Sequence, residues 1–160
     1  MALWQFKVTC LPERWIDAGG NPESLFGDDG YDTSPTWTDG DVTLLASEMG
    51  TILPQGSSWG PALKIWGAEE TDDIQLLHEN GKVLDLSIRF DLRHPNMALF
   101  KSTVAAAERL KMVILDVEHK RVVARDARSL LQAASKSSAA RFVKEPISFL
   151  LEGSQGGKAT

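Results

Sequence analysis

The fold is decided by the stretch Val83-Leu84-Asp85-Leu86-Ser87-Ile88-Arg89-Phe90-Asp91-Leu92-Arg93. From Leu84 to Leu92 every second residue is leucine, isoleucine or phenylalanine, and each residue between them is polar. A period of two is typical of a β-strand that buries one face and exposes the other. The stretch therefore predicts a central strand of a sheet, with its apolar side in the core.

Beyond His94-Pro95 the spacing of the apolar residues changes from two to that of a helix. The residues that recur at helical spacing are Met97, Phe100, Val104, Ala107 and Leu110. The stretch from Met112 to Leu115 is apolar throughout and predicts a further strand. A strand, a helix and a strand within about thirty-five residues match a βαβ unit. We expect the core to contain Leu84, Leu86, Ile88, Phe90, Phe100 and Val104.

The rest of the chain supplies further strands and helices around this unit. Strands are predicted at residues 3–9, 62–66, 73–79 and 121–124, and helices at 42–52, after 126 and from 146. The order β-α-β-β-β-α-β-β-α predicts a single α+β domain over residues 1–152, with a mostly antiparallel sheet and helices packed on one face. Residues 153–160 are small and polar and predict a flexible tail. Residues 12–35 show no apolar period and predict a long loop.

The turn around Gly81 sets the register between the central strand and the strand before it. A two-residue loop would place Ile74 and Leu76 on the wet face. A three-residue loop, with Gly81 left-handed in a bulge, pairs Leu76 with Leu84 and Ile74 with Leu86. Because this second register puts all the apolar residues on one face, we expect the three-residue loop.

The composition is that of a soluble globular protein and excludes several classes of function. Hydrophobic residues make up 42% and charged residues 24%, no apolar run is long enough to span a membrane, and the N-terminus does not have the pattern of a signal peptide. Cys10 is the only cysteine, so no intramolecular disulfide can form and a cytoplasmic location is expected. A pI near 5.2 argues against nucleic-acid binding.

The charges are distributed unevenly along the chain. Residues 1–80 hold three basic and fourteen acidic residues, a balance of −11, whereas residues 81–160 hold fourteen basic and eight acidic residues, a balance of +6. The acidic half includes the loops between Asp28 and Asp41. If the two halves separate on the folded surface, the acidic side attracts a basic protein partner.

One motif raises the alternative that the chain is a small hydrolase. Gly56-Ser57-Ser58-Trp59-Gly60 fits the pattern around a nucleophilic serine. That turn needs a strand before it and a helix after it. Because Pro54 and Pro61 flank the motif and a short strand follows, the sequence disfavours Ser58 as a nucleophile.

A group of carboxylates raises the alternative of a metal-dependent enzyme. Asp28, Asp29 and Asp32 lie close together, and oxygen ligands at short spacing can bind calcium. Their spacing does not match an EF-hand loop, and Asp-Asp-Gly is common in turns. We therefore expect these residues to be turn residues, with no catalytic residue, no metal and no cofactor in the chain.

The wet face of the central strand is the predicted binding surface. Because this strand alternates so regularly, no helix is expected over its polar side. Lys64 and Trp66 are expected to join that face, with Leu63 and Ile65 of the same strand pointing inward. An aromatic residue and arginines on a flat surface are typical of a protein interface. The predicted protein-binding residues are Lys64, Trp66, Asp85, Arg89, Asp91 and Arg93.

These observations predict a non-catalytic protein-binding module that acts through the open sheet face and the acidic loops. The plan of the chain resembles that of small bacterial α+β proteins that neutralise a partner toxin, which implies an immunity-type inhibitor. An enzyme that uses Ser58 or the cluster of Asp28, Asp29 and Asp32 is the first alternative. A structural or oligomerisation domain is the second, since the sequence leaves the oligomeric state open.

The lack of a ligand pattern predicts that the fold does not depend on a metal ion. The melting temperature should therefore stay the same when calcium or zinc is added and when a chelator is added. A melting temperature that rises by many degrees with calcium, and falls again with chelator, would contradict this expectation.

Overall fold

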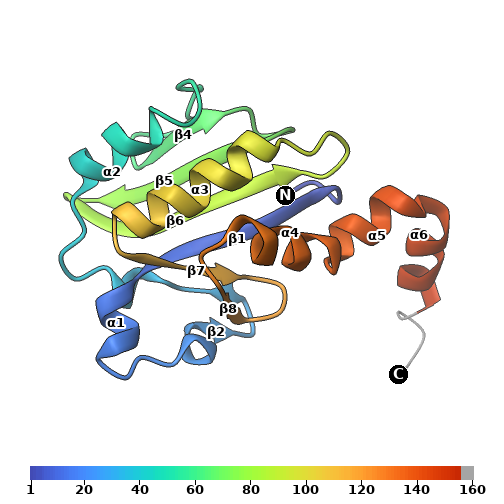
Figure 1. The fold of residues 1–160 in the computed structure, drawn as a ribbon, viewed down its shortest axis with the longest axis horizontal. Coiled ribbons are helices and arrows are strands. Elements are labelled where there is room, and N and C mark those ends of the chain that lie inside the picture. The colour runs from blue at the N-terminus through green and yellow to red at the C-terminus, as the bar shows by residue number, and fades with distance from the viewer. Residues whose placement is uncertain (156–160) are drawn as a thin grey trace.

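A six-stranded antiparallel sheet in the order β4-β5-β6-β1-β7-β8 organises the described part of the chain, residues 1–155 (Figure 1). This structure is a computed structural model. The strands of the sheet are β1 (Gln5–Pro12), β4 (Leu63–Gly67), β5 (Asp73–Glu79), β6 (Lys82–Asp91), β7 (Met112–Asp116) and β8 (Arg121–Val123). The helices are α1 (Glu13–Asp17), α2 (Val42–Met49), α3 (Met97–Arg109), α4 (Ala127–Ser135), α5 (Ser138–Lys144) and α6 (Pro146–Gln155). A small hairpin joins β2 (Phe26–Gly27) and β3 (Gly30–Tyr31).

Helices α2, α3 and α4 pack on one face of the sheet and share one core cluster with it. The predicted α+β class, with its largely antiparallel sheet, is confirmed. Strands β6 and β7 each run antiparallel to β1, which lies between them, so they run parallel to one another. Helix α3 connects β6 to β7. The predicted βαβ unit is therefore present in split form, with β1 inserted into it.

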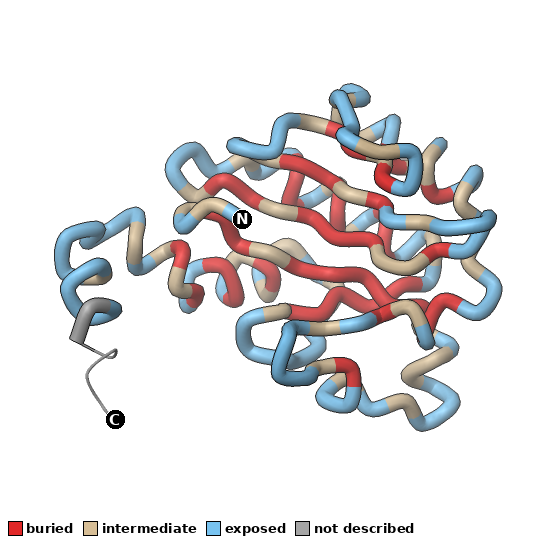
Figure 2. The backbone as a smooth tube through the Cα atoms, turned by 180° about the vertical axis from the view of Figure 1, so that it is seen from behind, coloured by how far each residue is buried: buried red, intermediate tan, exposed pale blue. Residues whose placement is uncertain are grey.

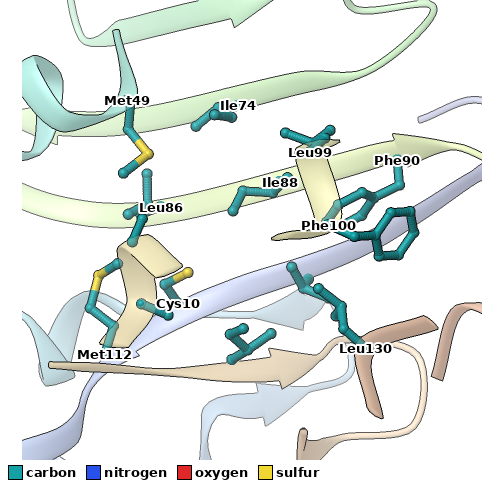
Figure 3. Packing of buried hydrophobic residues seen from close by; sticks show 14 of the residues in the cluster. Cys10, Met49, Ile74, Leu86, Ile88, Phe90, Leu99, Phe100, Met112 and Leu130 are labelled. Carbon is teal, nitrogen blue, oxygen red and sulfur yellow. The ribbon is translucent and has the colours of Figure 1, made fainter. Parts of the chain in front are cut away.

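The core lies between the sheet and α3, as the alternation in β6 predicts (Figure 3). Leu86, Ile88 and Phe90 are each at most 2% exposed. The rings of Phe90 and Phe100 stack with their centres 4.3 Å apart. Val104 packs against the same cluster and is partly buried. Five of the six expected core residues therefore lie in this layer.

Leu84 does not enter this core, because β6 carries one extra residue at that position. Leu77 of β5 stands opposite Asp85, whereas the next residue, His78, stands opposite Val83. Leu84 is therefore the extra residue of a β-bulge, which reverses the alternation of side chains. Val83 enters the core, where it is 1% exposed, and Leu84 lies with Asp85 on the second face of the sheet.

The bulge takes the place of the three-residue turn that the sequence predicts. Asn80 and Gly81 both have positive φ, at 50° and 75°, and form a two-residue turn. The predicted pairing of Leu76 with Leu84 is wrong, since Leu76 stands opposite Leu86. Ile74 and Leu76 of β5 still share the helix-covered face with the apolar residues of β6 that follow the bulge, because the bulge shifts the register within β6 instead of at the turn.

The second face of the sheet is covered at one end, whereas no helix lies over its middle (Figure 2). The polar residues of this middle part, among them Thr9, Asp73 and Ser87, are nevertheless buried. At the β7 end, Leu11, Val113 and Leu115 form a second apolar cluster with Leu25 of the segment that follows α1. Helix α1 contributes Trp15 and Ile16 to this cluster. The predicted open face therefore extends over β5, β6 and the first half of β1 only.

The C-terminal helix extends into the predicted tail. α6 begins at Pro146, as expected, and continues to Gln155, so residues 153–155 are helical. The remainder of the predicted tail, residues 156–160, lies outside the described residues, and its flexibility stays a prediction. No helix within residues 1–155 is long and apolar enough to cross a membrane.

Replacing Phe90 by alanine tests the buried face of β6. Its side chain is 1% exposed, and its ring stacks on those of Phe6 and Phe100. Because the change leaves a cavity, we expect the free energy of unfolding to fall by about 3–5 kcal/mol. Urea denaturation followed by circular dichroism measures this, with Leu3→Ala, at a half-exposed position, as the control. A loss under about 1 kcal/mol, within the range of many surface changes, would contradict the packing.

Candidate functional site

A hollow of about 560 Å³ lies on the second sheet face, where residues 29–34 meet β5 and β6. We call it the sheet hollow. It contains three carboxylates, one ammonium group and two leucine side chains, of which Leu77 is 39% exposed. The sheet hollow therefore presents charged and apolar surface side by side. The lining residues are Lys7, Asp29, Gly30, Tyr31, Asp32, Thr33, Ser34, Leu77, Leu84 and Asp85.

Asp85 is the centre of a hydrogen-bond network that ties three segments together. The hydroxyl groups of Thr9 and Thr33 lie 2.6 Å and 2.7 Å from its Oδ1. The phenol of Tyr31 donates to its Oδ2 at 3.1 Å. Thr9 belongs to β1, whereas Tyr31 and Thr33 belong to residues 28–41, which we call the acidic segment. One carboxylate therefore holds the acidic segment against the sheet. Hydrogen bonds to a charged group are among the stronger ones in proteins.

The bulge supplies a second anchor for the acidic segment. The Thr33 hydroxyl lies 2.8 Å from the carbonyl oxygen of Leu84, which the bulge displaces from the regular ladder. Thr33 is 1% exposed. A hydroxyl group has one proton, so it shares that proton between the carbonyl and the Asp85 carboxylate. This buried residue therefore fixes the position of the loop on the sheet.

Lys7 and Tyr31 form one wall of the sheet hollow. The Lys7 ammonium group lies 4.8 Å from the centre of the Tyr31 ring. Burial lowers the pKa of Lys7, although the charge of Asp85 acts in the opposite direction. Burial, and then the Asp85 charge, raise the pKa of Tyr31. The phenol therefore keeps its proton at neutral pH and remains a donor to Asp85.

Arg89, a predicted binding residue, is committed to an ion pair beside the hollow. Its Nε donates to Oδ1 of Asp73 at 2.7 Å, and its Nη2 donates to Oδ2 of the same carboxylate. The Asp73 side chain is fully buried and that of Arg89 is 12% exposed. The hydrogen bonds that Arg89 donates to Asp73 raise the pKa of Arg89. The paired planar groups therefore present little free hydrogen-bonding surface to a partner.

Asp91, the last residue of β6, and Arg93, just beyond it, form a second ion pair. Arg93 donates from Nε and Nη2 to the two oxygens of Asp91, at 2.9 Å and 2.8 Å. Its guanidinium group also lies 4.0 Å from the centre of the Trp4 ring. The hydrogen bond from Arg93 lowers the pKa of Asp91. Arg93 remains 38% exposed, so of the two arginines it is the more accessible.

The expected placement of Lys64 and Trp66 on this face is wrong. Trp66 stands opposite Ile74 in the helix-covered core and is 4% exposed. Lys64 stands on the same side of β4 and borders α2. It is Leu63 and Ile65 that lie on the second face, where residues 54–56 run beside the edge of β4. Apolar residues occupy both sides of this strand, so its alternation alone does not say which side meets the helices.

The sequence misses several residues of the hollow. Lys7 could have been found, because it alternates with Phe6 and Val8 and therefore belongs to the wet side of β1. Tyr31 and Thr33 lie in the segment without an apolar period, and no local pattern places them beside Asp85. Of the six predicted residues, only Asp85 lines the hollow.

The residues of the enzyme alternative lie apart, with Ser58 in the loop before β4 and Asp29 and Asp32 in the lining of the sheet hollow. The Ser58 hydroxyl donates to the carbonyl oxygen of Gly60 at 2.7 Å, in a loop that joins α2 to β4 and so lacks the strand-to-helix turn. Asp32 accepts from the backbone N–H of Ser34, as turn residues do. Among the described residues, no three His, Cys, Asp or Glu side chains gather in a way that could hold a metal ion.

In comparisons with known proteins, no family model matches the chain, and neither a curated protein nor a solved structure matches it.

Replacing Asp73 by alanine tests how much its ion pair with Arg89 stabilises the fold. The change leaves the largely buried Arg89 without its partner. We expect the free energy of unfolding to fall by about 3 kcal/mol, the lower end of the effect of breaking a buried pair, because Arg89 keeps some contact with water. The comparison is Asp91→Ala, which frees the more exposed Arg93 and should cost distinctly less. Equal losses in urea denaturation would contradict this ranking.

Proposed function

We propose that this chain is a non-catalytic protein-binding module that binds a basic partner through the sheet hollow and the strands beside it, which no helix covers. The observation that carries the proposal is how the carboxylate of Asp85 is hydrogen-bonded. Its hydrogen-bond donors are three hydroxyl groups, and it lies in the same hollow as Asp29 and Asp32. The hollow is thus an acidic surface built by the fold.

The chemistry of the network leaves the hollow negative. Hydroxyl donors orient a carboxylate but do not neutralise its charge. Lys7 is the one cationic residue in the lining, against three carboxylates. A negative concave surface attracts a positively charged partner, speeds its encounter and disfavours partners of the same sign. The proposed partner therefore presents lysine or arginine side chains.

The hollow also has the apolar and rigid character that a protein interface needs. Leu77 and Leu84 supply apolar area next to the carboxylates. Thr33 and Tyr31 hold the acidic segment in place through Asp85. A surface that is already ordered loses less conformational entropy when it binds, and this favours affinity.

The partner class that we propose is a toxin with a basic surface, which makes the chain an immunity-type inhibitor. Inhibition by covering a partner requires a pre-formed complementary surface and no reacting group on the inhibitor. The acidic hollow and the adjoining sheet meet that requirement. The order of strands and helices resembles that of small toxin-neutralising proteins, and this analogy suggests the same partner class.

The experiment begins with the wild-type chain as bait in an extract of its native host at low salt, followed by mass spectrometry. A captured protein is then expressed alone and together with the chain. We expect expression of the partner alone to arrest growth and coexpression of the chain to restore it. If the captured protein is harmless alone, the immunity role is wrong. If the bait retains nothing more than a variant with a neutral hollow retains, the binding role is wrong as well.

The variant Asp29→Asn/Asp32→Asn tests the site. Asparagine keeps the size of each side chain and can still accept the hydrogen bond from Ser34. We expect association with the partner to slow by about tenfold at low salt, because electrostatic attraction is lost, and the difference to shrink at high salt. Surface plasmon resonance measures the rates.

The matched control is Glu108→Gln/Glu145→Gln. It removes the same charge from exposed positions outside the hollow. If both double variants slow association equally, the effect comes from net charge, and the hollow is not the binding site.

A further inference from the structure

A second hollow lies on the helix-covered side of the sheet, where the C-terminal end of α2 meets β4. We call it the α2 hollow. Its volume is about 500 Å³, within the range of small-molecule sites. Lys64 supplies its one charged side chain, and Ser47, Thr51 and Gln55 supply hydroxyl and amide groups. The α2 hollow shares no residue with the sheet hollow and has the opposite net charge.

The indole group of Trp66 brings a hydrogen-bond donor without an acceptor to the α2 hollow. Trp66 is 4% exposed, and among the described residues its N–H finds no acceptor. A Cβ atom at Gly50, which also lines the hollow, would lie 3.6 Å from Nε1. Because glycine has no side chain, a ligand atom can take that position. A buried N–H without an acceptor is costly, so a ligand that supplies one is favoured.

The end of α2 places a hydrogen-bond acceptor beside the same position. The carbonyl oxygen of Ser47 would also lie 3.6 Å from a Cβ atom at Gly50. The N–H groups of Gly50 and Thr51 donate to Ala46 and Glu48, so no residue of the described chain bonds to the Ser47 carbonyl. Unpaired carbonyls are normal at a helix end, where water or a ligand satisfies them. A donor and an acceptor that flank one position suit a hydroxyl group, which can both accept and donate.

Lys64 adds a positive charge that the fold does not compensate. Its ammonium group makes no ion pair and no hydrogen bond with another described residue, and no carboxylate lines the α2 hollow. Glu48, the one acidic residue of α2, accepts from Nε of Arg109 at 3.0 Å and is committed to that pair. An anionic ligand group therefore meets a free cation, and such charge-assisted contacts are the strong ones.

We propose that the α2 hollow binds a small hydroxy acid, with its carboxylate at Lys64 and its hydroxyl group between Trp66 and Ser47. The hydroxyl group accepts from Nε1 of Trp66 and donates to the carbonyl of Ser47. This placement agrees with the helix dipole, because the negative C-terminal end of α2 meets the donor and not the carboxylate. A hydroxy acid carries both groups in one small molecule.

Titration of the whole chain with lactate, glycerate and malate tests the proposal, with the NMR signals of the indole N–H groups as readout. Triple-resonance assignment identifies the Trp66 signal without a variant. We expect a hydroxy acid to shift this signal, and its analogue without the hydroxyl group, propionate or succinate, to bind about tenfold more weakly, because the analogue leaves the indole N–H unpaired. If none of the three shifts the signal, the proposal is wrong. An equal response to the analogues, or to sulfate, would mean an adventitious ion only.

Two variants test the two ends of the proposed ligand. Gly50 has φ −64°, which alanine adopts freely, and a Cβ atom there would lie 3.4 Å or more from its neighbours. Gly50→Ala should therefore keep the fold and the melting temperature, yet lose the Trp66 shift, because the methyl group occupies the position of the hydroxyl group. Lys64→Met should weaken binding about tenfold through the lost charge.

The matched control is Gly153→Ala in α6, where a Cβ atom would have no neighbour within 4 Å. It should bind the hydroxy acid like the wild type, and circular dichroism shows whether each variant is folded. A folded Gly50→Ala chain that binds as tightly as the wild type would overturn the placement of the hydroxyl group. A Lys64→Met chain of unchanged affinity would overturn the carboxylate contact.

Discussion

One extra residue in β6 determines how the two faces of the sheet are used. Because Leu84 bulges out of the ladder, Val83 turns into the core and Asp85 follows Leu84 onto the second face. A regular strand would place Leu84 under the helices. The displaced carbonyl of Leu84 then accepts a hydrogen bond from Thr33. The same irregularity thus completes the core on one side and attaches the acidic segment on the other.

The carboxylates of the second face differ in how their charge is compensated. Asp73 and Asp91 are each paired with an arginine, so their charge is largely neutralised within the fold. Asp85 receives its hydrogen bonds from hydroxyl groups. Burying a charge is costly unless hydrogen bonds replace those of water, and three donors meet that cost without removing the charge. This difference makes Asp85, rather than the more numerous ion pairs, the centre of the candidate site.

The sequence by itself determined the six strands of the sheet, the α+β class and the buried side of β6, because these depend on local periodicity that Leu86, Ile88 and Phe90 display directly. Its prediction of one long loop over residues 12–35 was wrong, since α1 and the β2–β3 hairpin lie there. It also placed Asp85 on the wet face. Only the tertiary structure decided which side of β4 meets the helices, and it placed Trp66 in the core. It alone brought Tyr31 to Asp85, since the position of a loop depends on contacts between residues far apart in the chain. Periodicity reports which residues share a side of an element, whereas a site depends on which sides the fold brings together.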